Sequence, residues 1–262
     1  MPDRPTGNIT DSTADSNLFV VGIGASAGGL TALEELFDRL PSDSGAAFVV
    51  IQHLSPDFKS LMKELLERHT DMRIYRVTQG MKLQPNSVYL IPPGKNLIVE
   101  ANLLRLEERK KDKKDKHEFN FPIDLFFASL AKNYQEKAIG VILSGTGSDG
   151  TYGLRAINEA EGIALVHDPE AAEYDGMPLS AIATEVVNQV LPVAELAELI
   201  YQCIISPPDF LDVESTENNL LTYSSLKKIS NLLAQTEGID FSFYKTSTMS
   251  RRIHRRDIVL VL

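Results

Sequence analysis

Short apolar runs alternate with amphipathic helical patterns along most of the chain. Runs rich in Val, Ile and Leu predict strands, and apolar residues that recur every three or four positions predict helices between them. Strands without polar alternation are typical of sheets that are buried on both faces. The predicted strands are residues 18–23, 47–52, 138–143, 163–166 and 187–191. The predicted helices are residues 29–40, 58–69, 123–134 and 193–204.

A further group of short strands interrupts this alternation. Residues 87–91, 96–100 and 103–107 are predicted to be antiparallel strands, the last two around the turn Ala101-Asn102. Together these patterns predict an α/β fold: a doubly wound, mostly parallel sheet with helices on both faces and an antiparallel hairpin at an edge.

Polar segments divide the chain into four parts. Residues 1–17 lack the apolar core of a signal peptide and are predicted to be a flexible tail. Residues 18–205 form the predicted main domain, and residues 206–221, rich in Pro, Ser, Glu and Asn, are predicted to be a linker. Residues 222–262 are predicted to be a small helical unit with a basic end.

Composition narrows the class of protein. With 262 residues and 43% hydrophobic content, the chain is typical of a globular protein. Its formal net charge of -10 argues against nucleic acid as a partner. The single cysteine, Cys203, excludes an intrachain disulfide and a cysteine-cluster metal site. We therefore expect no metal and no cofactor, and a reducing, cytoplasmic location.

A serine follows the first predicted strand in the pattern G-x-S-x-G. Ser26 lies between Gly24 and Gly28, where a tight strand-to-helix turn can present a hydroxyl as a nucleophile. The helix start supplies free amide donors, so the turns at Ala27-Gly28 and at Gly145-Thr146-Gly147 are expected to support an oxyanion.

Two other apolar runs end on the groups that such a serine needs. His53 follows residues 47–52, and Asp149 lies in the glycine-rich segment after residues 138–143. The carboxyl ends of parallel strands lie at one edge of a sheet, so these side chains are expected to meet Ser26 there. His53 would take the serine proton, and Asp149 would orient and stabilise the imidazolium.

Other interpretations of these residues stay open. The glycines around Ser26 also resemble a dinucleotide-binding turn, but the spacing G-x-G-x-x-x-G is one residue too long. His167 also ends a predicted strand and is a rival base. Asp149 can instead cap the helix that follows it. The order Ser, His, Asp and the short segment before Ser26 argue against an α/β-hydrolase.

Several motifs in the same order resemble the catalytic domain of the chemotaxis protein-glutamate methylesterase family, CheB. They cover about 190 residues, and they are residues 23–29, 52–54, 88–93, 122–126, 142–150 and 176–178. The resemblance implies a doubly wound sheet, a triad at Ser26, His53 and Asp149, and a substrate-site loop at Gly176, Met177 and Pro178.

The family resemblance also implies a reaction and partners. It implies hydrolysis of γ-glutamyl methyl esters on chemoreceptor helices, with deamidation of receptor glutamines in some members, and membrane association only through those receptors. Ala27 and Thr146 depart from the family pattern, which often has Thr and Met there. Many members carry a receiver domain that residues 1–17 are too short to form, so regulation by phosphorylation within this chain is not expected.

The C-terminal residues are similar to another family. Residues 238–256 resemble the N-terminal helical domain of the CheR receptor methyltransferases, whose basic region recognises receptors. Arg251, Arg252 and Arg255 fall at helical spacing and are expected to face an acidic receptor helix. Methyltransferase activity is not expected. The alternative functions are a non-catalytic chemosensory adaptor and a nucleotide-binding α/β protein.

Overall fold

Seven parallel strands form the central sheet of the protein. The computed structural model describes residues 17–52, 61–109 and 121–206. Every strand pair in this sheet is parallel, and the strand order is β10-β9-β8-β1-β2-β5-β3. The strands are β1 (Val20–Ala25), β2 (Ala47–Gln52), β3 (Arg73–Arg76), β5 (Ser87–Leu90), β8 (Ala138–Ile142), β9 (Ile163–His167) and β10 (Gln189–Leu191).

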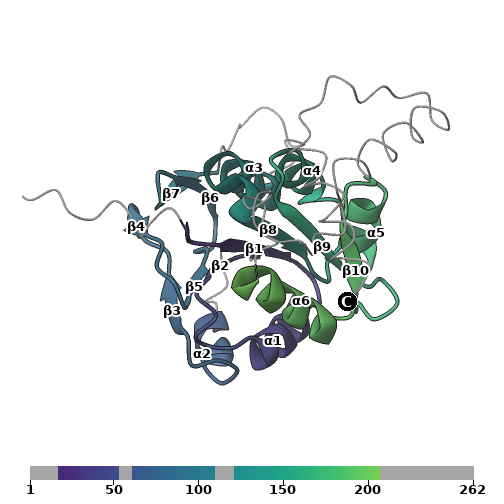
Figure 1. Cartoon of the computed structure of the whole chain (residues 1–262), viewed down its shortest axis with the longest axis horizontal. Helices are drawn as coiled ribbons and strands as arrows, with labels where there is room; N and C mark the ends of the chain where they lie inside the picture. The colour runs from purple at the N-terminus through teal and green to yellow at the C-terminus, as the bar shows by residue number, and fades with distance from the viewer. Residues whose placement is uncertain (1–16, 53–60, 110–120, 207–262) are drawn as a thin grey trace, which may run out of the picture. The chain divides into compact units, whose positions relative to one another are not determined.

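Helices cover both faces of this sheet. Figure 1 shows α3 and α4 on one side of the central strands, and α1 and α6 on the other. The helices are α1 (Gly29–Arg39), α2 (Met62–Leu66), α3 (Pro122–Tyr134), α4 (Thr151–Glu159), α5 (Gly176–Ile182) and α6 (Val193–Ile205), with a short 3-10 turn, η2 (Gln135–Lys137). The prediction of a doubly wound α/β fold is confirmed.

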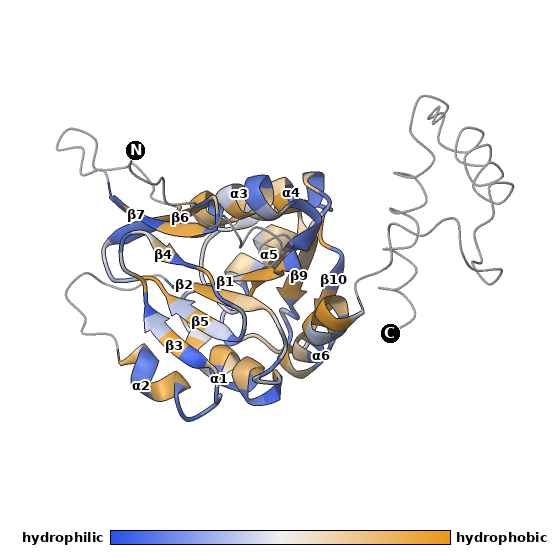
Figure 2. Cartoon of the chain, turned by 60° about the vertical axis from the view of Figure 1, so that its left-hand side comes forward, coloured by the Kyte–Doolittle hydropathy of each residue, from blue (hydrophilic) through white to orange (hydrophobic). Residues whose placement is uncertain are grey.

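The core follows from the apolar runs. The side chains of β1 and β8 are buried along the whole length of both strands. In Figure 2 hydrophobic residues are concentrated on the central strands and on the helix surfaces beside them. Burial on both faces explains why these strands read as continuous apolar runs, without the alternation of a half-exposed strand.

The antiparallel hairpin forms at the predicted residues but in a different sheet. β6 (Lys95–Glu100) and β7 (Leu103–Glu108) pair around Ala101 and Asn102, which have φ of 46° and 65°. β7 then pairs with β4 (Met81–Lys82), which gives a separate sheet of order β4-β7-β6. The expected position at an edge of the main sheet was wrong, because the other side of β6 faces α3: the Val99 amide donates to the Ser129 hydroxyl.

Three other elements differ from the sequence prediction. Residues 87–91 were expected to be antiparallel, but β5 lies fully buried and parallel between β2 and β3. β3 was not predicted, because its sequence RIYR reads as polar apart from one buried isoleucine. The helix expected at residues 58–69 is α2, limited to Met62–Leu66, and residues 58–60 lie outside the described residues.

The chain separates into two units, residues 1–201 and 202–262. Almost all described residues belong to the first unit, so the predicted linker and helical unit at residues 206–262 lie outside the description apart from residue 206. Within the described ranges no helix is long and apolar enough to cross a membrane.

Candidate active site

Ser26 lies on the tight turn between β1 and α1. The chain reverses at Gly28, whose φ of 68° is the left-handed conformation that glycine adopts without strain. The Gly29 amide donates to the Ser26 carbonyl oxygen at 3.0 Å, and the Ser26 side chain is half-buried. This strand–turn–helix context is the one expected for a serine presented as a nucleophile.

The glycine-rich segment after β8 packs directly against this turn. The Ser26 amide donates to the Ser144 carbonyl oxygen at 3.0 Å. A Cβ on Gly145 would lie 2.9 Å from the Ser26 Cβ and 2.2 Å from the Met177 Sδ, so the close approach of these three residues requires glycine. The structure therefore brings together the three loops that the sequence singled out.

Ser144 joins these loops and was not predicted as a site residue. Its side chain is 1% exposed, and its hydroxyl donates to the Ala27 carbonyl oxygen at 3.0 Å and accepts from the Tyr174 amide at 2.9 Å. The Ser180 hydroxyl likewise donates to the Gly147 carbonyl oxygen at 3.1 Å. These bonds fix residues 145–147 and the start of α5, which carries Gly176, Met177 and Pro178, to the nucleophile turn.

Not every predicted oxyanion donor is available. The Gly145 amide donates to the Tyr174 carbonyl oxygen at 3.0 Å, so it supports the loop and is already used. Within the described residues the amides of Ala27, Gly28, Thr146 and Gly147 make no backbone hydrogen bond outside the helices and strands. These four amides remain the candidates for binding an oxyanion.

Asp149 is held by the first turn of α3. Its side chain is 3% exposed, and its two carboxylate oxygens accept from the amides of Ile123 and Asp124, each at 3.0 Å. The alternative in which Asp149 caps its own helix was wrong, because the N-cap of α4 is Gly150 and has no side-chain cap. Burial lowers the pKa of Arg109, and the negative charge of Asp149 opposes that decrease. The Arg109 guanidinium is therefore close enough to interact electrostatically with the Asp149 carboxylate.

Asp124 completes a crossed pair of helix caps. Asp149 precedes α4 and caps α3, while Asp124 in the first turn of α3 accepts from the Gly153 amide of α4 at 2.7 Å. Burial and, to a lesser extent, the charge of Asp149 raise the pKa of Asp124 to about 6. Sequence reasoning missed this residue; the only signal was an acidic residue in the first turn after Pro122.

Replacement of Asp124 by asparagine is expected to stabilise the protein at neutral pH. Folding raises the pKa of Asp124, so the protonated carboxyl favours the folded state. This contribution to the free energy of unfolding is complete below about pH 4 and is lost as the pH rises to about 6. Asparagine keeps an oxygen acceptor for Gly153 without the charge. Solvent around this half-buried carboxyl reduces the effect of its charge. We therefore expect the variant's free energy of unfolding to be about 1 kcal/mol higher at pH 7.5, which corresponds to a melting temperature roughly 2–4 °C higher.

The check is a pair of calorimetric scans. The melting temperatures of the two proteins should coincide near pH 4 and separate above pH 6. A lower melting temperature for the asparagine variant at pH 7.5 would mean that the charged bonds to α4 outweigh the cost of burial.

The two candidate histidines differ in their distance from β1 within the sheet. His53 lies outside the described residues, but β2 ends at Gln52, which pairs in register with Ala25 next to Ser26. His167 ends β9, which is separated from β1 by β8, so it lies two strand spacings away, about 9–10 Å. Burial lowers the pKa of His167, and its Nδ1 has no hydrogen-bond partner within the described residues.

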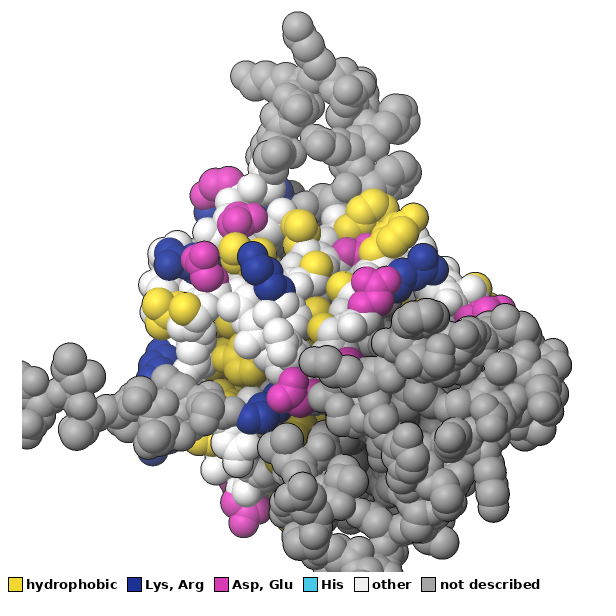
Figure 3. Space-filling model, turned by 45° about the horizontal axis from the view of Figure 1, so that its top comes forward, with side chains coloured by type: hydrophobic (Ala, Val, Ile, Leu, Met, Phe, Trp, Pro, Cys, Tyr) yellow, Lys and Arg dark blue, Asp and Glu magenta, His cyan; other side chains and the backbone are white. Residues whose placement is uncertain are grey.

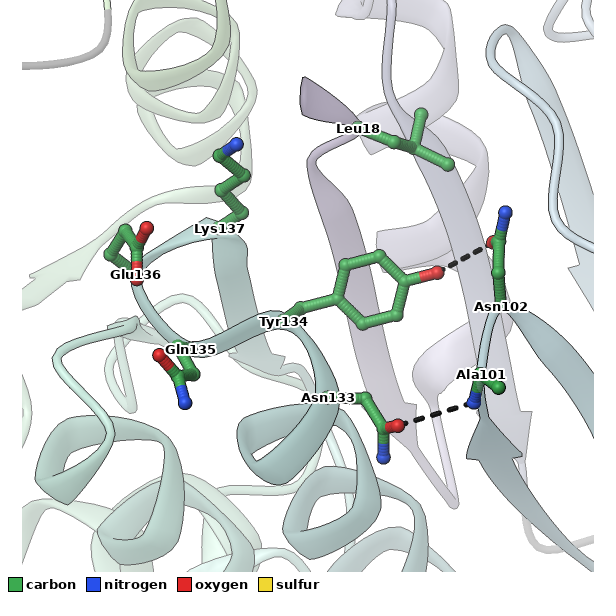
Figure 4. A pocket seen from close by; sticks show the side chains of 8 residues that line it. All are labelled: Leu18, Ala101, Asn102, Asn133, Tyr134, Gln135, Glu136 and Lys137. Atoms are coloured by element: carbon green, nitrogen blue, oxygen red, sulfur yellow. Dashed lines mark hydrogen bonds between the residues drawn. The ribbon is translucent and has the colours of Figure 1, made fainter. Parts of the chain in front are cut away.

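One pocket lies at the carboxyl ends of the sheet strands and another at their amino ends. One of about 200 Å³ lies at the carboxyl edge, where residues from the β1–α1 turn, the end of β9 and the start of α6 line it. Another pocket has a volume of about 260 Å³. It lies between the end of α3 and the β6–β7 turn (Figure 4). There the Tyr134 hydroxyl donates to the Asn102 side-chain oxygen at 2.7 Å. Leu18 and Lys137 precede β1 and β8, so this second pocket is at the amino edge, away from Ser26.

The surface over α3 and α4 carries charges of both signs. In Figure 3 Lys and Arg side chains alternate with Asp and Glu side chains, and hydrophobic side chains reach the surface between them. Leu125 and Tyr152, in the first turns of α3 and α4, are 41% and 73% exposed. No group of three or more His, Cys, Asp or Glu residues in the described ranges is arranged to hold a metal ion.

Known proteins share both the sequence and the fold of this domain. The model of the CheB methylesterase family matches residues 21–200. A Leptospira interrogans protein named putative protein-glutamate methylesterase/protein-glutamine glutaminase is 34% identical over 187 residues, which cover 70% of this chain and 93% of that protein. A Myxococcus xanthus protein-glutamate methylesterase/protein-glutamine glutaminase is 32% identical and is covered over 51% of its length.

A longer protein and a solved structure are also similar to this chain. An uncharacterized 104.1 kDa protein of Rhodobacter capsulatus is 34% identical over 215 residues, but the match covers only 22% of its length. The crystal structure of the Thermotoga maritima CheB methylesterase catalytic domain aligns with a TM-score of 0.63 and 27% identity. That alignment covers 71% of this chain and 98% of the Thermotoga chain, so the shared fold extends over nearly the whole of the Thermotoga catalytic domain.

Proposed function

This chain belongs to the CheB methylesterase family, and from that premise we propose that it hydrolyses γ-glutamyl methyl esters of chemoreceptors. The observation that carries the proposal is the position of Ser26: a half-buried serine on a strand-to-helix turn, packed against Gly145, at the sheet edge where Asp149 is also fixed. Deamidation of receptor glutamines, which releases ammonia in place of methanol, is proposed at the same site.

The reaction proceeds through an acyl-enzyme. The Ser26 hydroxyl attacks the ester carbonyl carbon while His53 accepts the hydroxyl proton. The tetrahedral intermediate collapses, the C–O bond to the methoxy group breaks, and His53 returns the proton so that methanol leaves. A water molecule, deprotonated by His53, then attacks the acyl-enzyme and releases the glutamate carboxylate together with Ser26.

Supporting groups act on charge and orientation. The amides of Ala27, Gly28, Thr146 and Gly147 are the proposed donors to the oxyanion of the intermediate. Asp149 accepts two bonds from α3, which prevent its carboxylate from turning toward solvent. A carboxylate has room for further acceptor bonds, and we assign one of these to the ring N–H of His53.

The test is methanol release from a receptor that carries labelled methyl esters on its glutamates. An esterase releases labelled methanol in proportion to enzyme and time. A chemosensory adaptor would bind the receptor and release none. Saturable binding without methanol or ammonia release would therefore reject the proposed activity in favour of the adaptor.

The receptor partner is proposed to be recognised in part by the basic C-terminal segment. Arg251, Arg252 and Arg255 lie outside the described residues, and their helical spacing and the resemblance to CheR domains support a docking role. Through such a receptor the protein would act in the cytoplasm beside the membrane.

Replacement of these three arginines by glutamine is expected to weaken turnover of intact receptor relative to a small soluble ester. We expect the ratio of the two kcat/KM values to fall several-fold at low ionic strength, through KM, and to approach that of the unmodified protein at high salt, because exposed charge pairs are screened. The matched control replaces three exposed arginines of the main domain by glutamine: Arg39, Arg68 and Arg155. If the ratio of the two kcat/KM values at low salt were equal in the unmodified protein, the variant and the control, the three arginines would have no docking role.

A further inference from the structure

The pocket at the carboxyl edge of the sheet lies beside the nucleophile turn. Its lining includes Gly28, two residues after Ser26, and Ser144, whose carbonyl oxygen accepts the Ser26 amide. The strand that follows β1 in the chain, β2, lies on one side of β1 in the sheet, and β8 lies on its other side. The strand order therefore reverses direction at β1, and the pocket lies at this topological switch point. Open α/β sheets bind ligands at such points. The pocket is therefore placed to contact whatever is bound at Ser26.

The mouth of this pocket is acidic. Glu35 of α1 and Glu173 of the loop before α5 both line it, and both are exposed. The Glu173 carboxylate rests directly over Gly28, since its Oε2 lies 2.9 Å from the point where a Gly28 Cβ would be. Neither glutamate makes an ion pair or a side-chain hydrogen bond within the described residues, and no Lys or Arg lines the pocket.

The floor of the pocket holds a buried histidine. The side chain of His167 is 5% exposed and lines the pocket, and its Nδ1 is without a hydrogen-bond partner in the described part of the chain. Burial keeps the pKa of His167 below its ordinary value, and the charge of Glu35 acts against that decrease, so the two groups interact through space. Two exposed carboxylates above a buried imidazole favour a ligand that carries N–H donors and positive charge.

We infer that this pocket is a specificity subsite that binds the ammonium or guanidinium group of a lysine or arginine in the polypeptide substrate. The inference rests on the proposed function, because the substrate is taken to be the chain that carries the ester. On a helical substrate, residues three and four positions apart are about 5–6 Å apart at Cβ, which is comparable to the span from Ser26 to Gly28. The basic residue is therefore placed three or four positions from the esterified glutamate.

The volume is consistent with this occupant. About 200 Å³ accommodates a butylammonium or propylguanidinium side chain and leaves room for a few water molecules of about 30 Å³ each. Ala32 and Val193 line the same pocket and supply apolar surface for the methylene groups of such a side chain.

The experiment compares two helical peptides that each carry one glutamate methyl ester. They differ only four residues from the ester, where one has lysine and the other norleucine, which has a chain of similar length without the charge. We expect kcat/KM to be about tenfold higher for the lysine peptide at low ionic strength, mostly through KM, with the preference shrinking as salt is added.

Variants assign this preference to the pocket. The double variant Glu35→Gln/Glu173→Gln is expected to reduce the ratio of lysine to norleucine kcat/KM to about one. The control Glu107→Gln/Glu159→Gln removes the same charge from exposed positions outside the pocket and should keep the ratio of the unmodified protein. A ratio near one in the unmodified protein, or a preference that survives in the Glu35→Gln/Glu173→Gln variant, would overturn the inference.

A binding measurement distinguishes two outcomes: that the pocket does not select a basic side chain, and that the protein is not an esterase. Equilibrium binding of both peptides to the Ser26→Ala protein, measured by fluorescence anisotropy, needs no turnover. A lysine preference in binding without hydrolysis by the unmodified protein would reject the esterase and keep the subsite. In a parallel arm n-butylammonium is titrated against the lysine peptide: weak, millimolar competition supports a substrate side chain, whereas micromolar binding would make a free amine the occupant and overturn the assignment.

Discussion

Replacement of Ser26 by alanine is expected to lower ester hydrolysis by on the order of 10³-fold or more, without loss of the fold. The change removes the hydroxyl that forms the acyl-enzyme. The Ser26 amide still donates to Ser144, and the packing of its Cβ against Gly145 is retained. The loss should therefore appear in kcat for methanol release, with an unchanged melting temperature.

A matched control is available in the turn that follows α1. Ser42 is an exposed residue in the turn between α1 and β2, and Ser42→Ala should hydrolyse the ester at the rate of the unmodified protein. If a folded Ser26→Ala protein retained near-normal turnover, the catalytic assignment of this serine would be lost, and the adaptor or a different nucleophile would have to be considered.

The predictable parts of the fold are the strands that are buried on both faces, because such burial requires continuous apolar runs in the sequence. β1 and β8 are buried on both faces, so their apolar runs identified both the strands and their parallel arrangement. The approach of Ser26 and Gly145 followed from the rule that parallel strands end at one edge. The hairpin turn was visible because Asn is one of the residues that tolerate left-handed backbone.

The parts that were missed depend on contacts between distant segments. The strand at residues 73–76 is an edge strand with two exposed arginines, so no apolar run marked it. The crossed caps between α3 and α4 join Asp124 to Gly153, and Asp149 to Ile123, over separations of 29 and 26 residues. Local spacing carries no information on such pairs, and the local alternative for Asp149 was that it caps the helix beside it.

The electrostatics of the site were also beyond the sequence. The pKa of Asp124 depends on how much solvent reaches it and on the nearby charge of Asp149, both of which are set by the packing of two helices. In the same way, the acidic pocket combines Glu35 and Glu173, which are separated by 138 positions and come together only across the sheet edge.

Replacement of His53 by glutamine is expected to cost on the order of 10³-fold or more in kcat/KM for a small ester, because it removes the base that activates Ser26. The strand order favours this histidine over His167. β2 is the immediate neighbour of β1, and its last residue pairs with Ala25, whereas β9 is separated from β1 by β8. A proton acceptor must come within hydrogen-bond distance of the serine hydroxyl, about 2.6–3.2 Å, which favours the adjacent strand.

The comparison with two other histidines makes this prediction specific. His167→Gln is expected to lose less than about tenfold on the same small ester, since the strand spacing places it away from the serine hydroxyl. His69→Gln is the control for general destabilisation: His69 lies beyond α2, where its Nδ1 is 3.0 Å from a carboxylate oxygen of Asp38. The kcat/KM of all three variants should be measured on folded protein. If His167→Gln abolished hydrolysis while His53→Gln spared it, the base would have to be assigned to the end of β9, and the serine would have to be reached across β8.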